Sequence, residues 1–192
     1  MSSFLSSTAN ITHSSRLPKG TTRAQALSML SDYEFFLSCD PHLDKFERIA
    51  DPAGSLDSAP SVPDSVKSQL RRSSSSSPDP VPTPTCYRVT DIVHAIPAGI
   101  WDTNVVSTYE FTDIKDGLFV RIRSPLSIVM DTFWQIREVE GEDGLLELVE
   151  DVNIQCSRLL IGLVKSQCEN GWAKIHAKMI SRLEEEGKTG SG

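Results

Sequence analysis

The sequence predicts an α+β fold in which a curved antiparallel sheet surrounds a long C-terminal helix. Two observations lead to this prediction. Five runs rich in β-branched and aromatic residues follow one another after residue 84, and short turn sequences separate them. The stretch 158–186 then carries apolar side chains at three- and four-residue intervals, which is the pattern of an amphipathic helix. Because an apolar sheet face must be covered, we expect this helix to lie across the sheet.

The predicted strands and their turns favour consecutive hairpins. Turn sequences such as Asp116-Gly117 are short enough to join antiparallel neighbours. Two weaker strand candidates, at 4–16 and 42–50, bring the expected sheet to seven strands and flank a helix expected at 22–38. Thr22 and Gln25 have the spacing of a capping box at the start of that helix. The five later strands are expected at 86–96, 103–114, 118–124, 127–139 and 145–157.

Period-two alternation assigns one apolar and one polar face to the last three predicted strands. Leu118, Val120 and Ile122 share the apolar face of the first of these strands. The strand at 127–139 continues this face with Ile128, Met130, Thr132, Trp134 and Ile136, and the strand at 145–157 with Leu146, Leu148, Val152, Ile154 and Cys156. The apolar face and the C-terminal helix are therefore expected to enclose the core.

The stretch 52–84 interrupts this pattern. It holds seven of the eleven prolines and ten serines, with almost no large apolar side chain. Such a segment buries too little surface to offset its ordering entropy, so we expect a disordered insertion. Strand patterns lie on both sides of it, which favours a single domain at 1–186 with a flexible tail at 187–192.

Composition narrows the classes of partner. A net charge of -7 and a pI near 5.1 disfavour nucleic acid and anionic membrane surfaces. The four cysteines form no C-x-x-C pair, and there is no G-x-G-x-x-G, H-E-x-x-H or G-x-S-x-G motif, so no metal and no cofactor is expected. No apolar run is long enough to cross a membrane and no signal peptide is evident, which favours a cytoplasmic protein without stable membrane insertion. The sequence does not indicate an oligomeric state.

The order of the predicted elements resembles the START-like superfamily, whose helix-grip fold also occurs in pollen allergen-like proteins and polyketide cyclases. Residues 32–36 (DYEFF), 39–41 (CDP) and 171–174 (GWAK) resemble an uncharacterised fungal group within it. The resemblance covers nearly the whole chain outside 52–84 and includes no catalytic signature. It implies a cavity between sheet and helix that binds hydrophobic small molecules and, in some members, catalyses cyclisation or dehydration.

Three residues are candidates for chemistry in such a cavity. Glu150 is in register with the apolar face of its strand, where a carboxyl would have a raised pKa and act as general acid or base; a bulge that turns it outward is the alternative. Tyr109 shares a face with Val105 and Phe111 and can orient a carbonyl, or can be a core tyrosine bonded to backbone. His94 can shuttle protons, or can be structural.

Seven further residues are candidates for ligand contact, because they lie on the faces expected to meet. They are Met130, Thr132, Trp134, Val152, Val164, Cys168 and Trp172.

Three function hypotheses follow. The first is a cofactor-free cyclase or isomerase acting on a polyketide or terpenoid of fungal secondary metabolism. The second is a non-catalytic carrier of a lipid, sterol or other hydrophobic ligand, which would need no inward carboxylate. The third is an interaction module whose Ser/Pro-rich stretch 52–84 recruits a partner and whose cavity is vestigial.

Overall fold

The fold is a seven-stranded sheet with a long helix on one face, as the sequence predicts. The computed structural model describes residues 6–56, 59–71, 83–94 and 102–189, with the backbone alone at 93, 94, 102 and 103. All strand pairs are antiparallel, in the order β1-β7-β6-β5-β4-β3-β2. The strands are β1 Ser6–Arg16, β2 Leu43–Ile49, β3 Thr85–His94, β4 Asp102–Ile114, β5 Gly117–Ser124, β6 Ile128–Glu138 and β7 Leu146–Ser157.

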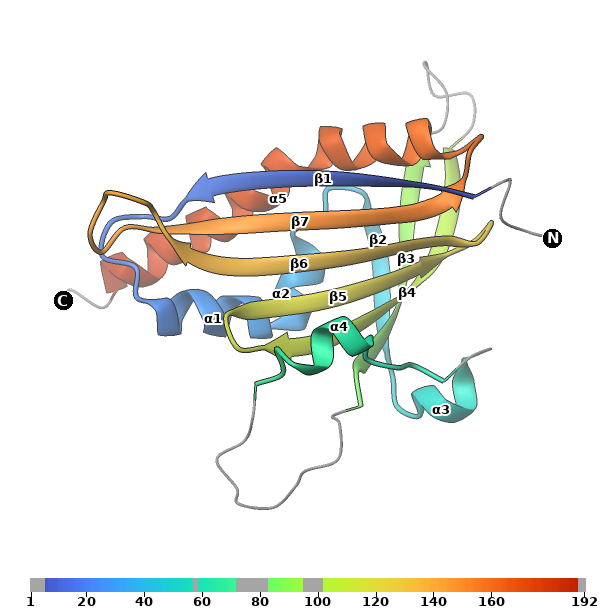
Figure 1. Cartoon of the computed structure of the whole chain (residues 1–192), viewed down its shortest axis with the longest axis horizontal. Helices are drawn as coiled ribbons and strands as arrows, with labels where there is room; N and C mark the ends of the chain where they lie inside the picture. The colour runs from blue at the N-terminus through green and yellow to red at the C-terminus, as the bar shows by residue number, and fades with distance from the viewer. Residues whose placement is uncertain (1–5, 57–58, 72–82, 95–101, 190–192) are drawn as a thin grey trace.

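The sheet curves around the last helix. In Figure 1, β5, β6 and β7 run along the molecule and β2 and β3 run crosswise in its right half, while α5 (Ile161–Thr189) begins above β1 and continues behind the strands toward the left. The inner face carries the alternating apolar side chains expected from the sequence, including Leu118, Val120 and Trp134, each at most 3% exposed. Helix α5 continues through residues 187–189, so the expectation of a flexible tail from 187 is wrong for these three residues. Residues 190–192 lie outside the described residues.

The single helix expected at 22–38 is two helices, α1 (Arg23–Ser31) and α2 (Tyr33–Ser38). The predicted capping box at Thr22 is present, with Gln25 as its partner. Asp32 separates the helices because its ψ of 82° is not helical, and its side chain accepts a hydrogen bond from the backbone N–H of Phe35. An aspartate that caps a new helix competes with continuation of the old one, and this changes the direction of the chain before it reaches β2.

The close approach of β5 and β6 requires a glycine at position 117, the first residue of β5. A Cβ at Gly117 would lie 1.8 Å from the backbone oxygen of Trp134 on the neighbouring strand β6. Real atoms do not approach so closely, so only glycine allows β5 and β6 to pair at this point. The pairing continues from here along β5 and sets the register of the inner face.

The stretch 52–84 differs from the expected disordered insertion wherever it is described. It forms α3 (Pro52–Ser55) and α4 (Asp64–Lys67), and Val62 and Val66 are buried. These valines and the partly buried Leu70 pack on the outer sheet face against Ile114, Phe119 and Phe133. The three side chains are spaced four residues apart, so few apolar groups are enough to hold residues 59–71 against the sheet. Residues 57–58 and 72–82 lie outside the described residues.

This contact leads to a stability prediction for the outer-face segment. Val66 is fully buried, so Val66→Ala should lower the free energy of unfolding by about 2 kcal/mol through lost burial and a small cavity. Val106→Ala removes the same atoms from a side chain that is 47% exposed and should change it by less than about 0.5 kcal/mol. Urea unfolding measures both. Equal effects of the two substitutions would contradict the packing of this segment.

Candidate functional site

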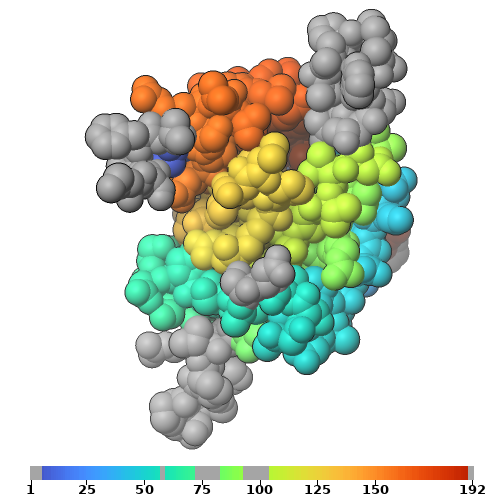
Figure 2. Space-filling model, turned by 90° about the vertical axis from the view of Figure 1, so that its right-hand side faces the viewer, coloured from blue at the N-terminus to red at the C-terminus, as the bar shows by residue number. Residues whose placement is uncertain are grey.

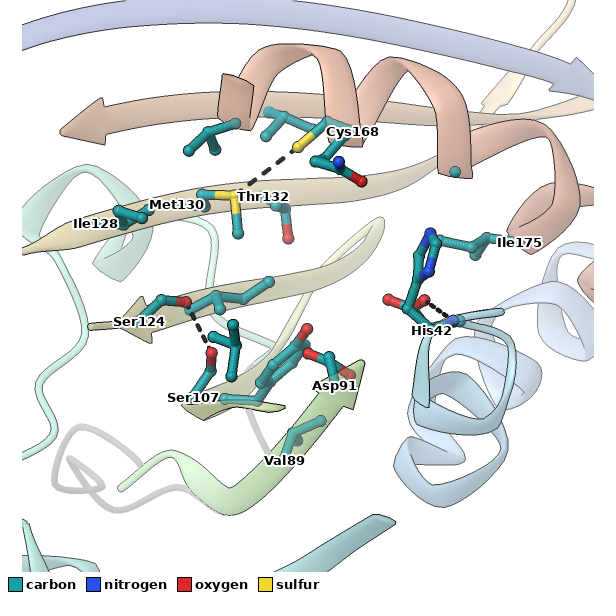
Figure 3. Close-up of a pocket in the computed structure, with 18 of the residues that line it drawn as sticks. His42, Val89, Asp91, Ser107, Ser124, Ile128, Met130, Thr132, Cys168 and Ile175 are labelled. Carbon is teal, nitrogen blue, oxygen red and sulfur yellow. Dashed lines mark hydrogen bonds between the residues drawn. The ribbon is translucent and has the colours of Figure 1, made fainter. Parts of the chain in front are cut away.

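A cavity of about 390 Å³ lies between the inner sheet face and the first half of α5. Its lining comes from α2, from β2 to β7 and from α5, and is predominantly apolar. Figure 3 shows side chains of β3, β4, β5 and β6, among them Val89, Ser107 and Met130, around one space that Cys168 of α5 faces from the other side. This volume is in the range of small-molecule sites.

All seven residues predicted to contact a ligand line this cavity. Thr132 and Trp134 are fixed by hydrogen bonds: the Trp134 indole Nε1 donates to Thr132 Oγ1 at 3.3 Å, and Thr132 Oγ1 donates to the Val120 carbonyl at 3.1 Å. The sulfur atoms of Met130 and Cys168 are 3.9 Å apart across the space. The placement agrees with the alternation in the sequence, while ligand binding by these residues stays a prediction.

The cavity opens to solvent where β5 turns into β6 and α5 begins. Leu126 and Leu163 both line it, yet they are 72% and 44% exposed. Leu126 and Ser127 have positive φ angles of 62° and 58°, which lets the chain turn tightly here. Figure 2 looks onto this end of the molecule, with the start of α5 above the β5–β6 turn. A ligand therefore meets exposed leucines before it meets the interior.

Glu150 points into the cavity from the middle of β7. The pairing of β7 with β1 and with β6 runs through Glu150 without a shift, so the bulge that would have turned it outward is absent at this position. The residue is 8% exposed and lines the cavity. Burial, and secondarily the negative charge of Asp151, raise the pKa of Glu150 to about 7. Its carboxyl can therefore act as either acid or base near neutral pH.

His13 is the principal partner of Glu150. Its Nδ1 lies 3.1 Å from Glu150 Oε2, and its ring stacks on Trp172 of α5 with centroids 4.5 Å apart. Burial lowers the His13 pKa, and the charge of Glu169 opposes this. Sequence reasoning missed His13. It shares a face of β1 with the buried Ile11, but the strand carries mostly small polar residues, so alternation marks that face only weakly.

A second histidine, His176, packs beside the same carboxyl. Its Nδ1 is hydrogen-bonded to Ser15 Oγ at 2.8 Å, and its Nε2 lies 3.8 Å from Glu150 Oε2 without a hydrogen bond. Burial, and then the neighbouring His13, lower the pKa of His176 to about 4, so its ring is neutral at pH 7. Glu150 therefore has two imidazole neighbours. His13 can exchange a proton with its carboxyl, whereas His176 is neutral at pH 7 and places no positive charge beside it.

Tyr109 also lines the cavity, on β4. Its ring is half-buried and stacks on Phe111, and within the described residues its hydroxyl makes no hydrogen bond to protein. The alternative of a core tyrosine bonded to backbone is therefore not what the structure shows. Burial, followed by the charges of Asp91 and Asp40, raises the Tyr109 pKa well above its usual value, so the hydroxyl is a donor at neutral pH. The side chain of His94, the third catalytic candidate, lies outside the described residues.

Two further carboxyl groups, Asp40 and Asp91, line the cavity near α2 and β3. Asp91 shares the inner face of its strand with the buried Val89, and burial, then the charge of Asp40, raise its pKa to about 7. Over the described ranges no group of three or more His, Cys, Asp or Glu side chains is arranged to hold a metal ion. Nor does any helix in those ranges combine the length and hydropathy needed to cross a membrane.

Comparison with known proteins identifies the family and the fold. A family model described as a domain of unknown function (DUF7053) matches residues 6–185. A search of curated proteins finds no match.

Several solved structures share the fold at low sequence identity. Ara h 8.0201 is 10% identical with a TM-score of 0.55, and the match covers 93% of this chain and 99% of that one. A conserved protein from Geobacillus kaustophilus is 13% identical with a TM-score of 0.56, covering 92% and 96%. A norcoclaurine synthase point mutant from Thalictrum flavum, in complex with a transition state analogue, is 11% identical with a TM-score of 0.57, covering 95% and 98%. These similarities confirm the START-like helix-grip fold.

The raised pKa of Glu150 predicts how stability depends on pH. Its folded-state pKa, about 7, lies above the ordinary value of 4.5, so ionisation opposes folding. The cost is absent below about pH 4.5, grows up to pH 7 and is constant above. Glu150→Gln keeps the shape without the charge. It should therefore stabilise the protein at pH 8, by on the order of 2 kcal/mol relative to its effect at pH 4.5.

Urea unfolding of both proteins at pH 4.5 and pH 8 measures this difference. His13 and His176, whose pKa values burial lowers, are present in both proteins, so their own contributions cancel to first order. Glu138→Gln, at an exposed position, is the matched control and should show no such pH dependence. A Glu150→Gln effect that is the same at both pH values would contradict the raised pKa.

Proposed function

The chain belongs to the DUF7053 family, and we propose that it is a cofactor-free proton-transfer enzyme, a cyclase or isomerase, that holds a hydrophobic intermediate in the cavity between α5 and the sheet. The observation that carries this proposal is the buried Glu150 carboxyl facing an apolar cavity with His13 3.1 Å away. A carrier has no need of an ionisable group at such a position, because burying a carboxyl is costly. In an enzyme, the same burial moves the pKa to where proton transfer is efficient.

The proposed reaction moves a proton between two positions of one substrate. Ionised Glu150 takes a proton from a carbon next to a carbonyl, and an enolate forms. The protonated carboxyl then returns the proton at another position, so no oxidant, reductant or net proton is needed. His13 assists because its Nδ1 can donate to the carboxylate or accept from the carboxylic acid, depending on its tautomer. The hydrogen bond thus persists in both states of Glu150.

Tyr109 is the proposed donor to the substrate oxygen. Its hydroxyl has no partner within the described part of the chain, it faces the cavity, and its pKa is raised, so it can donate a hydrogen bond to a carbonyl without ionising. A donor that is fixed before the reaction stabilises charge as it develops in the transition state. Polyketide and terpenoid intermediates, including those of fungal secondary metabolism, are the substrate class we favour, because they combine apolar surface with reactive carbonyls or double bonds.

A non-catalytic carrier of a lipid, sterol or similar hydrophobic ligand is the second candidate. The mostly apolar lining and the exposed Leu126 and Leu163 at the opening favour it, since both suit passive uptake of an apolar molecule. The two candidates differ in one property. The enzyme moves protons with Glu150, whereas the carrier binds without chemistry. The synthase of the same fold that was solved with a transition state analogue supports the first candidate.

An assay that does not need the natural substrate can test whether Glu150 acts as a general base. 5-Nitrobenzisoxazole loses its ring C–H proton to a base while its N–O bond breaks, giving a coloured cyanophenolate. The wild-type protein should accelerate this reaction, with a rate that rises with pH through about 7 as Glu150 ionises. Glu150→Gln should lower the rate by on the order of 100-fold, because general-base catalysis contributes about that much.

Controls separate the cavity from the rest of the surface. Glu138→Gln removes an exposed carboxyl and should react at the wild-type rate. A wild-type rate for Glu150→Gln would rule out Glu150 as the base. If the wild-type protein binds the compound without accelerating its reaction, the carrier is the better description.

A further inference from the structure

The charges on the cavity wall are unbalanced. Asp40, Asp91 and Glu150 line it, and no lysine or arginine does so among the described residues. The other titratable side chains of the lining are His42, Tyr109 and Cys168. Tyr109 and Cys168 both have raised pKa values, so neither supplies a charge near neutral pH. The described wall therefore offers carboxyl groups to a ligand without a lysine or arginine beside them.

One carboxyl of this wall has an unused acceptor that is buried. Asp91 Oδ1 is inaccessible to solvent and has no hydrogen-bond partner among the described residues. In Figure 3, Asp91 extends from β3 on the side of the cavity where His42 also lies. A buried acceptor left without a donor costs about 1 to 3 kcal/mol, so the hydrogen-bonding capacity of the Asp91 carboxyl is incompletely satisfied. The neighbouring Asp40 is already engaged, because its Oδ1 accepts the backbone N–H of His42 at 2.8 Å.

A second unused acceptor belongs to Glu150, whose side chain is 10% exposed. Its Oε2 is hydrogen-bonded to His13, whereas its Oε1 has no partner in the described structure. Asp91 on β3 and Glu150 on β7 lie on strands that are four places apart in the sheet. The strand pairing also offsets them along the strands, because Asp91 lies opposite Val105 of β4 whereas the register leads from Glu150 to Asp113 of β4. Both residues line the same cavity, from different strands of its wall.

We propose that the cavity selects hydrophobic ligands that carry a protonated amino group, and that Asp91 is the residue that anchors this group. A charged donor fits better than a hydroxyl, because an ammonium adds Coulomb attraction to its hydrogen bond with the carboxylate and no lysine or arginine of the described lining competes for it. When Asp91 binds the amino group, Glu150 remains available to take a proton from the reacting carbon. This inference rests on the proposed function and specifies its substrate class.

Three probes of matched shape test the charge preference. These are 2-(2-naphthyl)ethylamine, 2-(2-naphthyl)ethanol and 3-(2-naphthyl)propanoate, titrated into the full chain by calorimetry at pH 8. The amine should bind about 10-fold more tightly than the alcohol, and the carboxylate should bind more weakly than both. An amine that binds no more tightly than the alcohol would overturn the inference while leaving a hydrophobic cavity function intact. If none of the three binds, both the inference and the proposed function are wrong.

Substitution of the anchor tests its assignment. Asp91→Asn should reduce the amine's advantage to less than about 3-fold and leave the affinity for the alcohol within about 2-fold, since only the charge is removed. Asp44→Asn removes an equal charge from an exposed position on β2 and should leave all three affinities unchanged. If Asp91→Asn keeps the full amine preference, Asp91 is not the anchor. The comparison of the three probes on the wild-type protein needs no variant, so it decides the charge preference independently.

Discussion

The packing of α5 against the inner sheet face is the constraint on which the site depends. The helix is anchored by its second half, where His176, Met179 and Leu183 are buried against the core. Before Gly171 none of its described residues is buried, and the inward side chains, Val164 and Cys168 among them, border the cavity instead. One continuous helix therefore serves as core at one end and as the roof of a cavity at the other. Because α5 is one continuous hydrogen-bonded helix, the packing of its second half holds its first half above the cavity.

The same arrangement explains why a carboxyl can be buried at Glu150. The helix brings Trp172 and His176 over β7, and β1 brings His13 beside it, so the charge is removed from water but not from polar partners. Burial lowers the pKa of both imidazoles, which disfavours the cation that would pull the Glu150 pKa back down. The pKa of the Glu150 carboxyl is therefore about 7, so both of its protonation states are populated at neutral pH.

Much of this could be predicted from the sequence because most strands alternate cleanly. Period two placed Trp134 and Thr132 on the inner face, and the turn sequences gave the order of the hairpins. For Glu150, period two indicated the inner face but left an outward bulge open, and the unshifted pairing of β7 decided between them. The rest depends on information that no local pattern contains. His13 meets Glu150 through pairing between β1 and β7, and β1 has few apolar side chains to mark its faces. In 59–71, composition suggested disorder although three well-spaced apolar side chains are buried or partly buried on the sheet. The break at Asp32 reflects capping, which overrides a helical repeat that continues through it.

The position of β1 has a consequence for how the site comes into being. His13 and Glu150 are separated by 137 residues in the sequence, and β1 pairs with β7 along its whole length. Contacts of such long range form late, because the entropy of closing the intervening loop must be overcome first. During synthesis, β1 cannot pair until β7 has been made, and the contact between His13 and Glu150 forms together with this pairing. The paired Glu150 and His13 that the proposed proton transfer needs therefore exist only in the completed sheet, and a growing chain lacks them.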